Sequence, residues 1–390
     1  MKEEPIKIIV PRWGRTFINF MNRLYSITND ERIEKIINAV ASSKDNASNN
    51  NQEAFNYLQK LIQEGNTYVT IAPDRKHPES PYRVGFLGMD ILINGVSVRI
   101  EGDEPHNGTS LIKLSEADIA LAGLDELLAT NYPYLSKTTE VTSWGAYNYN
   151  IQEPTDLRVA GSANLKSSDG ILDVVGLFLI TTKQNKYKDL DELANENIPI
   201  YVKGRYEGAI AYAYGSTKPR KLNLKLVNNV EDSVFNNPGS YGIEIVQSGN
   251  TIKKKDLVVI DEPLLNSESL YTVDQGKYCN NPGIQNVLDA LGIVNYYNEG
   301  RAKEFTEWFY NLEKKLGENW INKSDPVTIF LGEKNGLTEV GLWPMNTREL
   351  IMNPDIDMRN EAEKERFQKT YSTTETIIMK KYNELRKSEN

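Results

Sequence analysis

An acidic residue followed by a short polar loop marks the segment 242–252 as a candidate site for phosphate chemistry. Glu244 lies near the end of an expected strand, 241–246. Ligands bind at such strand ends in open α/β sheets, and a carboxylate there can accept hydrogen bonds from sugar hydroxyls. Glycine lets a backbone approach an anion, and hydroxyls and successive N–H groups donate hydrogen bonds to it. The pattern predicts a phosphate cradle, with an ordinary turn as the alternative. The loop residues are Ser248, Gly249, Asn250 and Thr251.

A second candidate for anion binding is a pair of arginines near the beginning of the chain. Arg12 and Arg15 flank Trp13 and Gly14, directly after an expected strand at 6–10. Guanidinium groups bind phosphates through two parallel hydrogen bonds. The pair therefore indicates a phosphate contact, and two solvated loop charges are the alternative.

Asp125 is a third candidate, because it follows the buried-strand pattern at 117–121. An aspartate at the beginning of a helix often accepts hydrogen bonds from the first backbone N–H groups. The same residue could instead face a ligand, and the sequence leaves both roles open.

The counts of cysteine and histidine argue against several other chemistries. Cys279 is the only cysteine, so neither an internal disulfide nor a zinc site built from cysteines is expected. The two histidines, His77 and His106, have no motif around them that indicates a Ser-His-Asp relay. With one cysteine and no secretory-type N-terminus, we expect a cytoplasmic protein.

Charge and composition restrict the partners further. The 390 residues are 39% hydrophobic and 25% charged, with a net charge of −9, which is typical of a globular chain and unfavourable for general nucleic-acid binding. No run of 18 apolar residues is present, so a membrane partner is not expected.

Apolar periodicity predicts strands that alternate with short helices, which is typical of βαβ units and largely parallel sheets. A near-continuous apolar run at 172–181 favours a strand covered on both faces. A helical stripe at 301–316 indicates a helix packed on a core. Further strands are expected at 6–10, 68–72, 117–121, 198–202, 222–227, 241–246 and 257–260, and further helices at 16–24, 53–64, 190–194, 207–214 and 361–386.

Taken in order, these blocks resemble the ATP phosphoribosyltransferase family of histidine biosynthesis, with this chain as a divergent member. The acid, the apolar pair and the Ser-Gly-x-Thr loop at 244–251 match the phosphoribosyl pyrophosphate loop of the family. The family has an aspartate where this chain has Ser240. The other similar blocks lie at 6–15, 117–125, 176–202, 257–260 and 266–269, the last as a polar turn.

The resemblance implies an α/β, two-lobed type II periplasmic-binding-protein-like fold with a C-terminal helical extension. Lobe one would hold residues 1–173, with insertions near 42–52 and 73–108, and the chain would return to it at 257–281. Lobe two would hold 174–256, and the extension 282–390.

The resemblance also implies a phosphoribosyltransferase, which moves ribose 5-phosphate from phosphoribosyl pyrophosphate to a nitrogen of a purine nucleotide such as ATP. Mg²⁺ would accompany the pyrophosphate, because a hard cation suits phosphate oxygens. Glu244 and Arg15 would be catalytic, while Arg12, Asp125 and the loop Ser248–Thr251 would bind substrate. Further copies of the chain are candidate partners. The alternative is a non-catalytic module of the same fold that binds a phosphorylated ligand, which the serine at position 240 favours.

Overall fold

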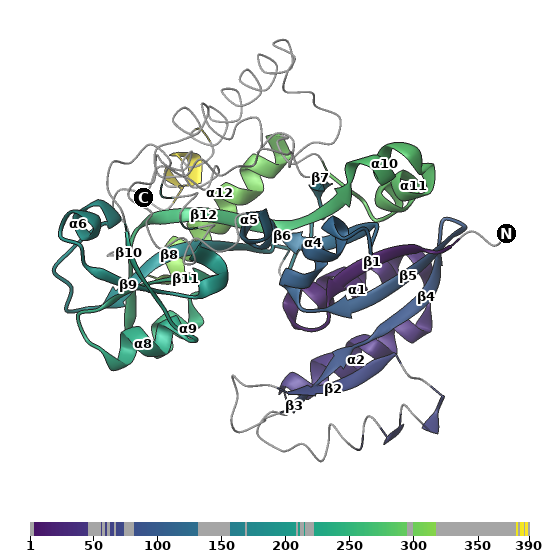
Figure 1. Ribbon diagram of the computed structural model, residues 1–390, viewed down its shortest axis with the longest axis horizontal. Coiled ribbons are helices and arrows are strands. Elements are labelled where there is room, and N and C mark those ends of the chain that lie inside the picture. Colours follow the sequence, from purple (N-terminus) through teal and green to yellow (C-terminus); the bar gives the residue numbers. More distant parts are fainter. Residues whose placement is uncertain are drawn as a thin grey trace, which may run out of the picture. The chain divides into compact units, whose positions relative to one another are not determined.

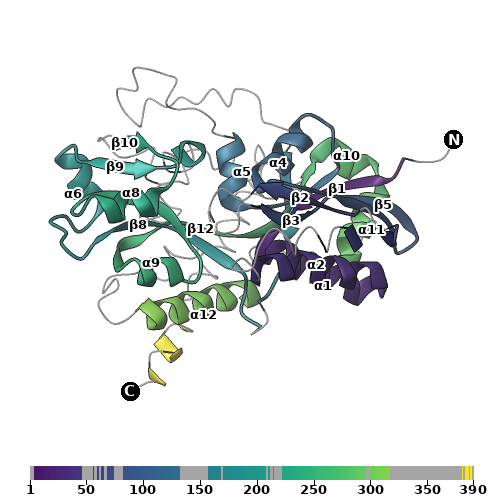
Figure 2. The same cartoon turned by 90° about the horizontal axis from the view of Figure 1, so that it is seen from below.

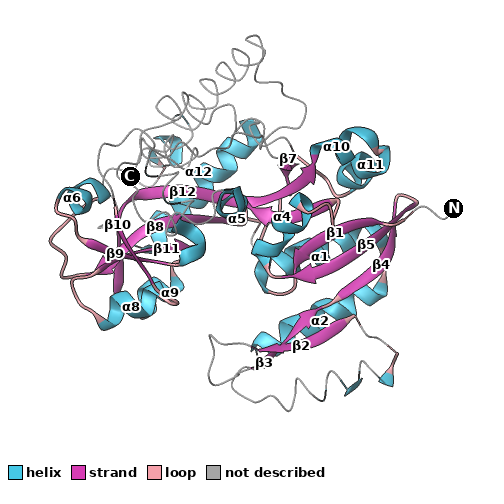
Figure 3. Cartoon of the chain, in the orientation of Figure 1, coloured by secondary structure: helices cyan, strands magenta, loops and turns pink. Residues whose placement is uncertain are grey.

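The computed structural model describes most of the first 316 residues and a few positions near the C-terminus (Figure 1). Helices and strands alternate along the described chain (Figure 3). The longer described segments are 4–45, 68–73, 82–131, 157–167, 170–207, 222–294 and 299–316, and shorter ones are 56, 59–60, 63–65, 210, 214, 380, 383–385 and 387–388.

The chain divides into two compact units, and each is discontinuous in the sequence. Unit 1 comprises residues 1–122, 156–173 and 269–294, and unit 2 comprises 123–155, 174–268 and 295–390. This organisation confirms the predicted α/β fold with two lobes. The chain passes between the units after residues 122, 155, 173, 268 and 294. The predicted domain boundaries at 173/174, 256/257 and 281/282 stay predictions.

Unit 1 is built on a mixed sheet with the strand order β12-β6-β1-β5-β4. Its centre is β1, which pairs in parallel with β5 and with β6, while β4 pairs antiparallel with β5. A further strand, β7, pairs antiparallel with the last part of β12. The bounds are β1 Ile6–Pro11, β4 Gly88–Ile93, β5 Val96–Asp103, β6 Ile119–Gly123, β7 Leu157–Ser162 and β12 Leu257–Asp274.

Apolar faces of helices cover the sheet of unit 1 and form its core. The helix α1 (Gly14–Thr28) buries Phe17, Phe20, Met21 and Leu24, the spacing expected of one helix face. The core also includes side chains of α2 (Glu31–Asp45) and of α11 (Pro282–Ala290). The remaining helices of this unit are α4 Pro105–Lys113 and α10 Gln275–Asn280.

Part of the region expected to be an insertion belongs to this sheet. The strand β5, within the predicted insertion 73–108, lies beside the central β1 and buries Val98 and Ile100. Within 73–108, β4 and β5 pair antiparallel as a hairpin, and β2 (Val69–Pro73) pairs antiparallel with β3 (Tyr82–Phe86). The other predicted insertion, 42–52, begins as the last turn of α2, and residues 46–52 lie outside the described residues.

Unit 2 is built on a sheet with the strand order β10-β9-β11-β8-β12. Three strands, β10, β9 and β11, run parallel, and β8 lies antiparallel between β11 and β12. The run expected at 172–181 forms β8, and the expected strand 241–246 forms β11 with the same bounds. The bounds are β8 Val174–Thr182, β9 Pro199–Val202, β10 Asn223–Leu226 and β11 Tyr241–Val246.

Side-chain caps fix the beginnings of two helices in unit 2. Asp189 accepts a hydrogen bond from the backbone N–H of Glu192 at α6, and Asn229 accepts one from Asp232 at α8. Such caps satisfy N–H groups that have no partner within the helix. The helices of this unit are α5 Leu124–Asn131, α6 Leu190–Asn195, η3 Gly204–Tyr206, α8 Val230–Asn236, α9 Asn250–Lys254 and α12 Glu299–Leu316.

The polar residues at 266–269, expected to form a turn, lie inside the long strand β12. Residues 265–268 pair with β8, and residues 270–274 pair with β7, so backbone hydrogen bonds hold the polar segment extended. Local composition favours a turn there, and pairing with distant strands overrides it.

The helical stripe expected at 301–316 is confirmed, because α12 spans it and buries Trp308, Phe309 and Leu312. Most of the expected helix at 361–386 lies outside the described residues, as does most of 53–64. In the described part of the chain, no helix is both long and apolar enough to span a membrane.

Candidate functional site

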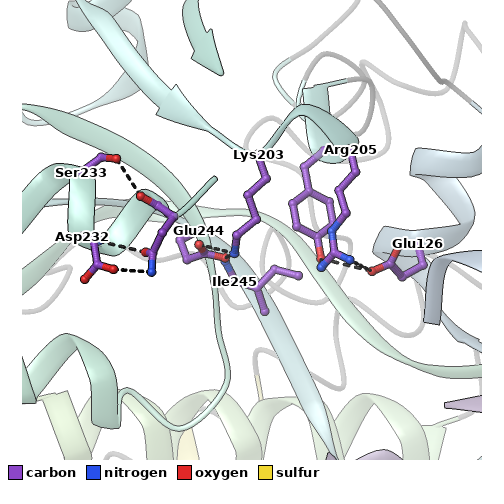
Figure 4. Close-up of polar contacts among 9 residues, drawn as sticks. Glu126, Lys203, Arg205, Asp232, Ser233, Glu244 and Ile245 are labelled. Carbon is purple, nitrogen blue, oxygen red and sulfur yellow. Dashed lines mark hydrogen bonds and ion pairs between the residues drawn. The ribbon is translucent and has the colours of Figure 1, made fainter. Parts of the chain in front are cut away.

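A buried ion pair lies near the carboxyl ends of the adjacent parallel strands β9 and β11 in unit 2. Lys203 directly follows β9, and its Nζ donates to both carboxylate oxygens of Glu244 on β11, each at 2.5 Å (Figure 4). The Glu244 side chain is 6% exposed and that of Lys203 is 22% exposed. The backbone N–H of Ile245 donates to the same carboxylate at 3.0 Å. Carboxyl ends of parallel strands are the usual location of ligand sites in α/β sheets.

A second charged group is formed by η3 and α5. Arg205 Nη1 lies 3.3 Å from Glu126 Oε1, and its Nη2 donates to the Tyr206 hydroxyl at 2.5 Å. That hydroxyl in turn donates to Glu126 Oε1 at 3.2 Å. Lys203 and Arg205, two residues apart, thus point to different carboxylates, Glu244 and Glu126 (Figure 4).

The surroundings of Glu126 change its acidity. Burial, and next the negative charge of Asp125, raise the pKa of Glu126 to about 7, against the opposing effect of Arg205. Burial, followed by the charges of Asp125 and Glu126, also raises the pKa of the Tyr206 phenol well above its ordinary value. Glu126 can therefore exchange a proton near neutral pH, which is the property of a general acid or base.

Asp125 connects this group to strand β12. Its Oδ1 accepts a 2.5 Å hydrogen bond from the Ser267 hydroxyl, and its backbone N–H donates to the Ser267 Oγ at 3.2 Å. Both side chains are buried. The Asp125 carboxylate thus bonds to a side chain of β12, and its predicted capping and ligand-binding roles stay predictions.

Replacing Glu126 by glutamine should remove a pH dependence of stability. The unfolded glutamate loses its proton near pH 4.5 and the folded one near pH 7, so between these values the folded state binds more protons and stability falls as pH rises. The shift corresponds to about 3 kcal/mol of unfolding free energy lost by the wild type between pH 4 and pH 8. Glu126→Gln should lack this loss and be the more stable protein at pH 8.

The measurement is urea unfolding of wild type and variant at pH values from 4 to 8. Glu196→Gln, an exposed carboxylate in the same unit, is the control and should follow the wild-type curve. Parallel curves for wild type and Glu126→Gln would show that the folded carboxyl titrates normally.

The predicted phosphate loop forms the beginning of the short helix α9. Gly249 adopts a positive φ of 69°, which favours glycine, and it is buried against α12. A β-carbon placed at this position would lie 2.6 Å from Leu316 Cδ2. Figure 2 shows the short helix α9 beside α12. Ser248 is half-buried, and Asn250 and Thr251 are exposed. The end of α12 therefore packs against the middle of the loop, leaving its last two residues open to solvent.

Lysines near this loop have different surroundings. Lys255 forms an ion pair with Asp232, in the first turn of α8. Lys253 and Lys254 are exposed. Lys253 and Lys254 can therefore contribute positive charge beside the loop, whereas Lys255 would have to give up its ion pair with Asp232 to do so.

The two arginines of the sequence prediction belong to unit 1 and contact other residues of that unit. Arg12 Nη2 lies 2.5 Å from Glu104 Oε1, and its guanidinium lies 4.3 Å from the centre of the Trp13 ring. Arg15 Nη1 is 3.9 Å from Asp173 Oδ1. Their predicted roles toward a ligand stay predictions.

Unit 2 holds the remaining predicted site residues: Asp125, Glu244 and the loop 248–251. Sequence reasoning missed Glu126, and no local signal could have found it, since an acid in the first turn of a helix is ordinary. The positions of Lys203 and Arg205 after a strand were the available signal for the cations.

No group of three His, Cys, Asp or Glu side chains is arranged to hold a metal ion among the described residues. The carboxylates of Glu126 and Glu244 each contact a cation of the chain.

Comparisons with known proteins gave matches among solved structures only. No family model matches the chain, and no curated protein matches it. An ATP phosphoribosyl transferase complex from Thermotoga maritima is similar with 11% identity and a TM-score of 0.36, over 73% of this chain and 98% of that one.

Two other similar structures are described as binding proteins. The first, a putative binding component of an ABC transporter from Wolinella succinogenes complexed with lysine, has 10% identity and a TM-score of 0.34, over 81% of this chain and 97% of that one. The second, an arginine-bound binding protein from Thermotoga maritima, has 11% identity and a TM-score of 0.30, over 50% and 76%. At these scores the likenesses carry no argument about function, which must rest on the residues.

Proposed function

We propose that unit 2 binds a phosphorylated small molecule and that the chain is a phosphoribosyltransferase. It would transfer ribose 5-phosphate from phosphoribosyl pyrophosphate to a nitrogen of a purine nucleotide such as ATP. The observation that supports this best is the ion pair of Lys203 and Glu244. Glu244 lies on β11, which ends shortly before the loop 248–251. The pair supplies a cation for phosphate and a carboxylate for sugar hydroxyls within one site.

The reaction needs no nucleophile from the protein. The bond from the anomeric carbon to the pyrophosphate oxygen breaks, and its electron pair leaves with the magnesium-bound pyrophosphate. The lone pair of the purine nitrogen forms the new bond to the same carbon. Positive charge develops on the ribose ring in the transition state, so a nearby carboxylate stabilises it.

Binding would rearrange the ion pair. When phosphate oxygens approach Lys203, its Nζ can bond to them and give up one oxygen of Glu244. That oxygen then becomes available to a ribose hydroxyl. The loop hydroxyls of Ser248 and Thr251 and the loop N–H groups would hold the 5-phosphate.

The test is a thermal-shift comparison followed by an assay of pyrophosphate release with ATP and a panel of purines. Phosphoribosyl pyrophosphate with Mg²⁺ should raise the melting temperature more than ribose 5-phosphate or pyrophosphate, because a ligand at 100 times its Kd adds about 2.7 kcal/mol of stability. Equal, negligible shifts for all three ligands would contradict the donor assignment.

A second candidate function is a non-catalytic module that binds a phosphorylated ligand. It is favoured by the fact that both carboxylate oxygens of Glu244 already bond to Lys203, so an exchange must precede catalysis. If the protein binds the donor but releases no pyrophosphate with any purine, this second function is correct.

A further inference from the structure

Four successive polar residues are buried in the middle of strand β12. Their exposed fractions are 1% for Asn266, 3% for Ser267, 2% for Glu268 and 9% for Ser269. Buried polar groups are nearly always hydrogen-bonded, since burial removes their bonds to water. The same strand shows this rule at Thr272, whose hydroxyl donates to the Ala120 carbonyl.

Asn266 departs from the rule. In the part of the chain that the structure describes, neither Oδ1 nor Nδ2 of its carboxamide has a hydrogen-bond partner. The neighbouring Ser267 is bonded to Asp125, so the two adjacent residues differ in this respect. A carboxamide has two N–H donors and an acceptor oxygen, and leaving all of them unused is costly. Such a group requires an explanation, and a ligand is one.

The strand register places Asn266 on the same face of the sheet as Glu244. Asn266 lies opposite Gly176 of β8, and Gly176 lies opposite Val246 of β11. Directly opposite residues in antiparallel strands point to one face, and residues two apart on a strand share that face. Glu244 is two residues before Val246, so the unpartnered carboxamide and the ion-paired carboxylate belong to one face.

The separation of these residues suits a nucleoside-sized ligand. Two strand spacings give about 10 Å across the sheet, and two residues give about 7 Å along it, so the two Cα atoms are about 12 Å apart. Phe178 lies opposite Glu244 with its fully buried ring over Gly176, so a ligand that reaches both residues must displace this ring.

The chemistry of a carboxamide selects among ligand groups. A phosphate or carboxylate ligand would use only the N–H donors of the carboxamide. An adenine ring presents an exocyclic N–H donor beside a ring-nitrogen acceptor, and asparagine binds that edge through two hydrogen bonds. We propose that Asn266 recognises the adenine base of the purine acceptor, an inference that rests on the proposed function. Because Asn266 is 1% exposed, the ligand must displace side chains that cover it.

The experiment compares Asn266→Leu with a matched control on the same strand. Tyr271→Phe also removes a fully buried polar group without a partner among the described residues, in this case a hydroxyl within the hydrophobic core of unit 1. Affinities for ATP and for ITP, whose base carries an oxygen in place of the exocyclic amine, are measured by calorimetric titration. Melting temperatures with phosphoribosyl pyrophosphate and Mg²⁺ are measured on the same three proteins.

The wild type should bind ATP more tightly than ITP by roughly 5- to 100-fold, the discrimination of one bidentate contact. Asn266→Leu should lose this preference and keep the response to phosphoribosyl pyrophosphate, while Tyr271→Phe should behave as wild type. Asn266→Ser, which introduces a hydroxyl but lacks the paired donor and acceptor of the carboxamide, should also lose the preference. The serine variant tests the role of Asn266 if the leucine variant fails to fold.

The outcomes separate this inference from the proposed function. An ATP preference unchanged in both Asn266 variants overturns the role of Asn266, even if the donor still binds. No ATP binding by the wild type overturns it as well. An ATP preference that depends on Asn266, in a protein that does not respond to the donor, supports the inference and contradicts the transferase.

Discussion

Replacing Glu244 by glutamine should reduce the turnover of pyrophosphate release by about 30- to 1000-fold while changing donor affinity much less. The loss corresponds to about 2–4 kcal/mol, the cost of removing one group that stabilises transition-state charge. Glutamine keeps the size of the side chain and its ability to bond to hydroxyls. It removes the negative charge that becomes favourable only as the ribose ring becomes cationic.

At the loop 248–251 we expect a substitution to weaken donor binding more than it reduces turnover. Thr251→Val removes a hydroxyl that would contact the 5-phosphate in both the ground state and the transition state. It should therefore weaken donor binding and leave turnover at saturation nearly unchanged. Since Thr251 is exposed, the substitution should have little effect on folding.

The measurements are steady-state pyrophosphate release and a donor titration followed by melting temperature. Glu196→Gln, an exposed acid of the same unit, serves as the control for loss of one negative charge. A wild-type turnover in Glu244→Gln would exclude the proposed role of this carboxylate, even if the protein is a transferase.

The strands of unit 2 show how far local sequence determines this fold. The strand β11 begins and ends where apolar and β-branched residues predict, and β8 and β9 pair with its two edges. β12 extends 14 residues beyond its predicted end at Ile260. The polar residues that follow Ile260 indicate a turn locally, and only pairing with β8 and β7 makes them strand.

The same distinction holds in unit 1. β5 contains alternating apolar residues, yet it was predicted as part of an insertion, because its partner β1 lies about 90 positions away. Sequence patterns indicate that a segment is extended. They do not show which strand it will pair with, since that depends on the whole topology.

The candidate site illustrates a further limit. The acid of β11 and its loop could be found from sequence, because the acid, glycine and hydroxyl residues are contiguous. Glu126 could not be found, since its pKa is raised by burial in the folded chain and its polar partners, Arg205 and Tyr206, lie about 80 positions away, and proximity in space is not visible in a single sequence. The unpartnered state of Asn266 is likewise a property of the packed structure.

The largest effect on stability is expected at the ion pair of Lys203 and Glu244. Lys203→Met leaves the buried carboxylate without its cation, and Glu244→Gln leaves the lysine without its anion. Breaking a buried pair from one side commonly costs 3–5 kcal/mol, and the partial exposure of Lys203 reduces our expectation to about 2–4 kcal/mol for each variant.

The double variant should lose less unfolding free energy than the two single variants lose together. Once both charges are removed, no uncompensated charge remains in the sheet, and replacement of a buried pair by uncharged residues is often nearly neutral. We therefore expect the double variant to unfold within about 1–2 kcal/mol of the wild type, with a coupling energy of at least about 2 kcal/mol.

The matched control is the surface pair of Lys183 and Asp256 in the same unit, whose nitrogen and oxygen are also 2.5 Å apart but whose side chains are 65% and 74% exposed. Its cycle, with Lys183→Met and Asp256→Asn, should give a coupling below about 1 kcal/mol, because water screens exposed charges. The measurement is urea unfolding of all six variants and the wild type at pH 7. Equal coupling energies for the two pairs would mean that Glu244 and Lys203 are solvated in the folded protein. The Glu244 carboxylate would then lack the low-dielectric surroundings that its proposed role in catalysis requires.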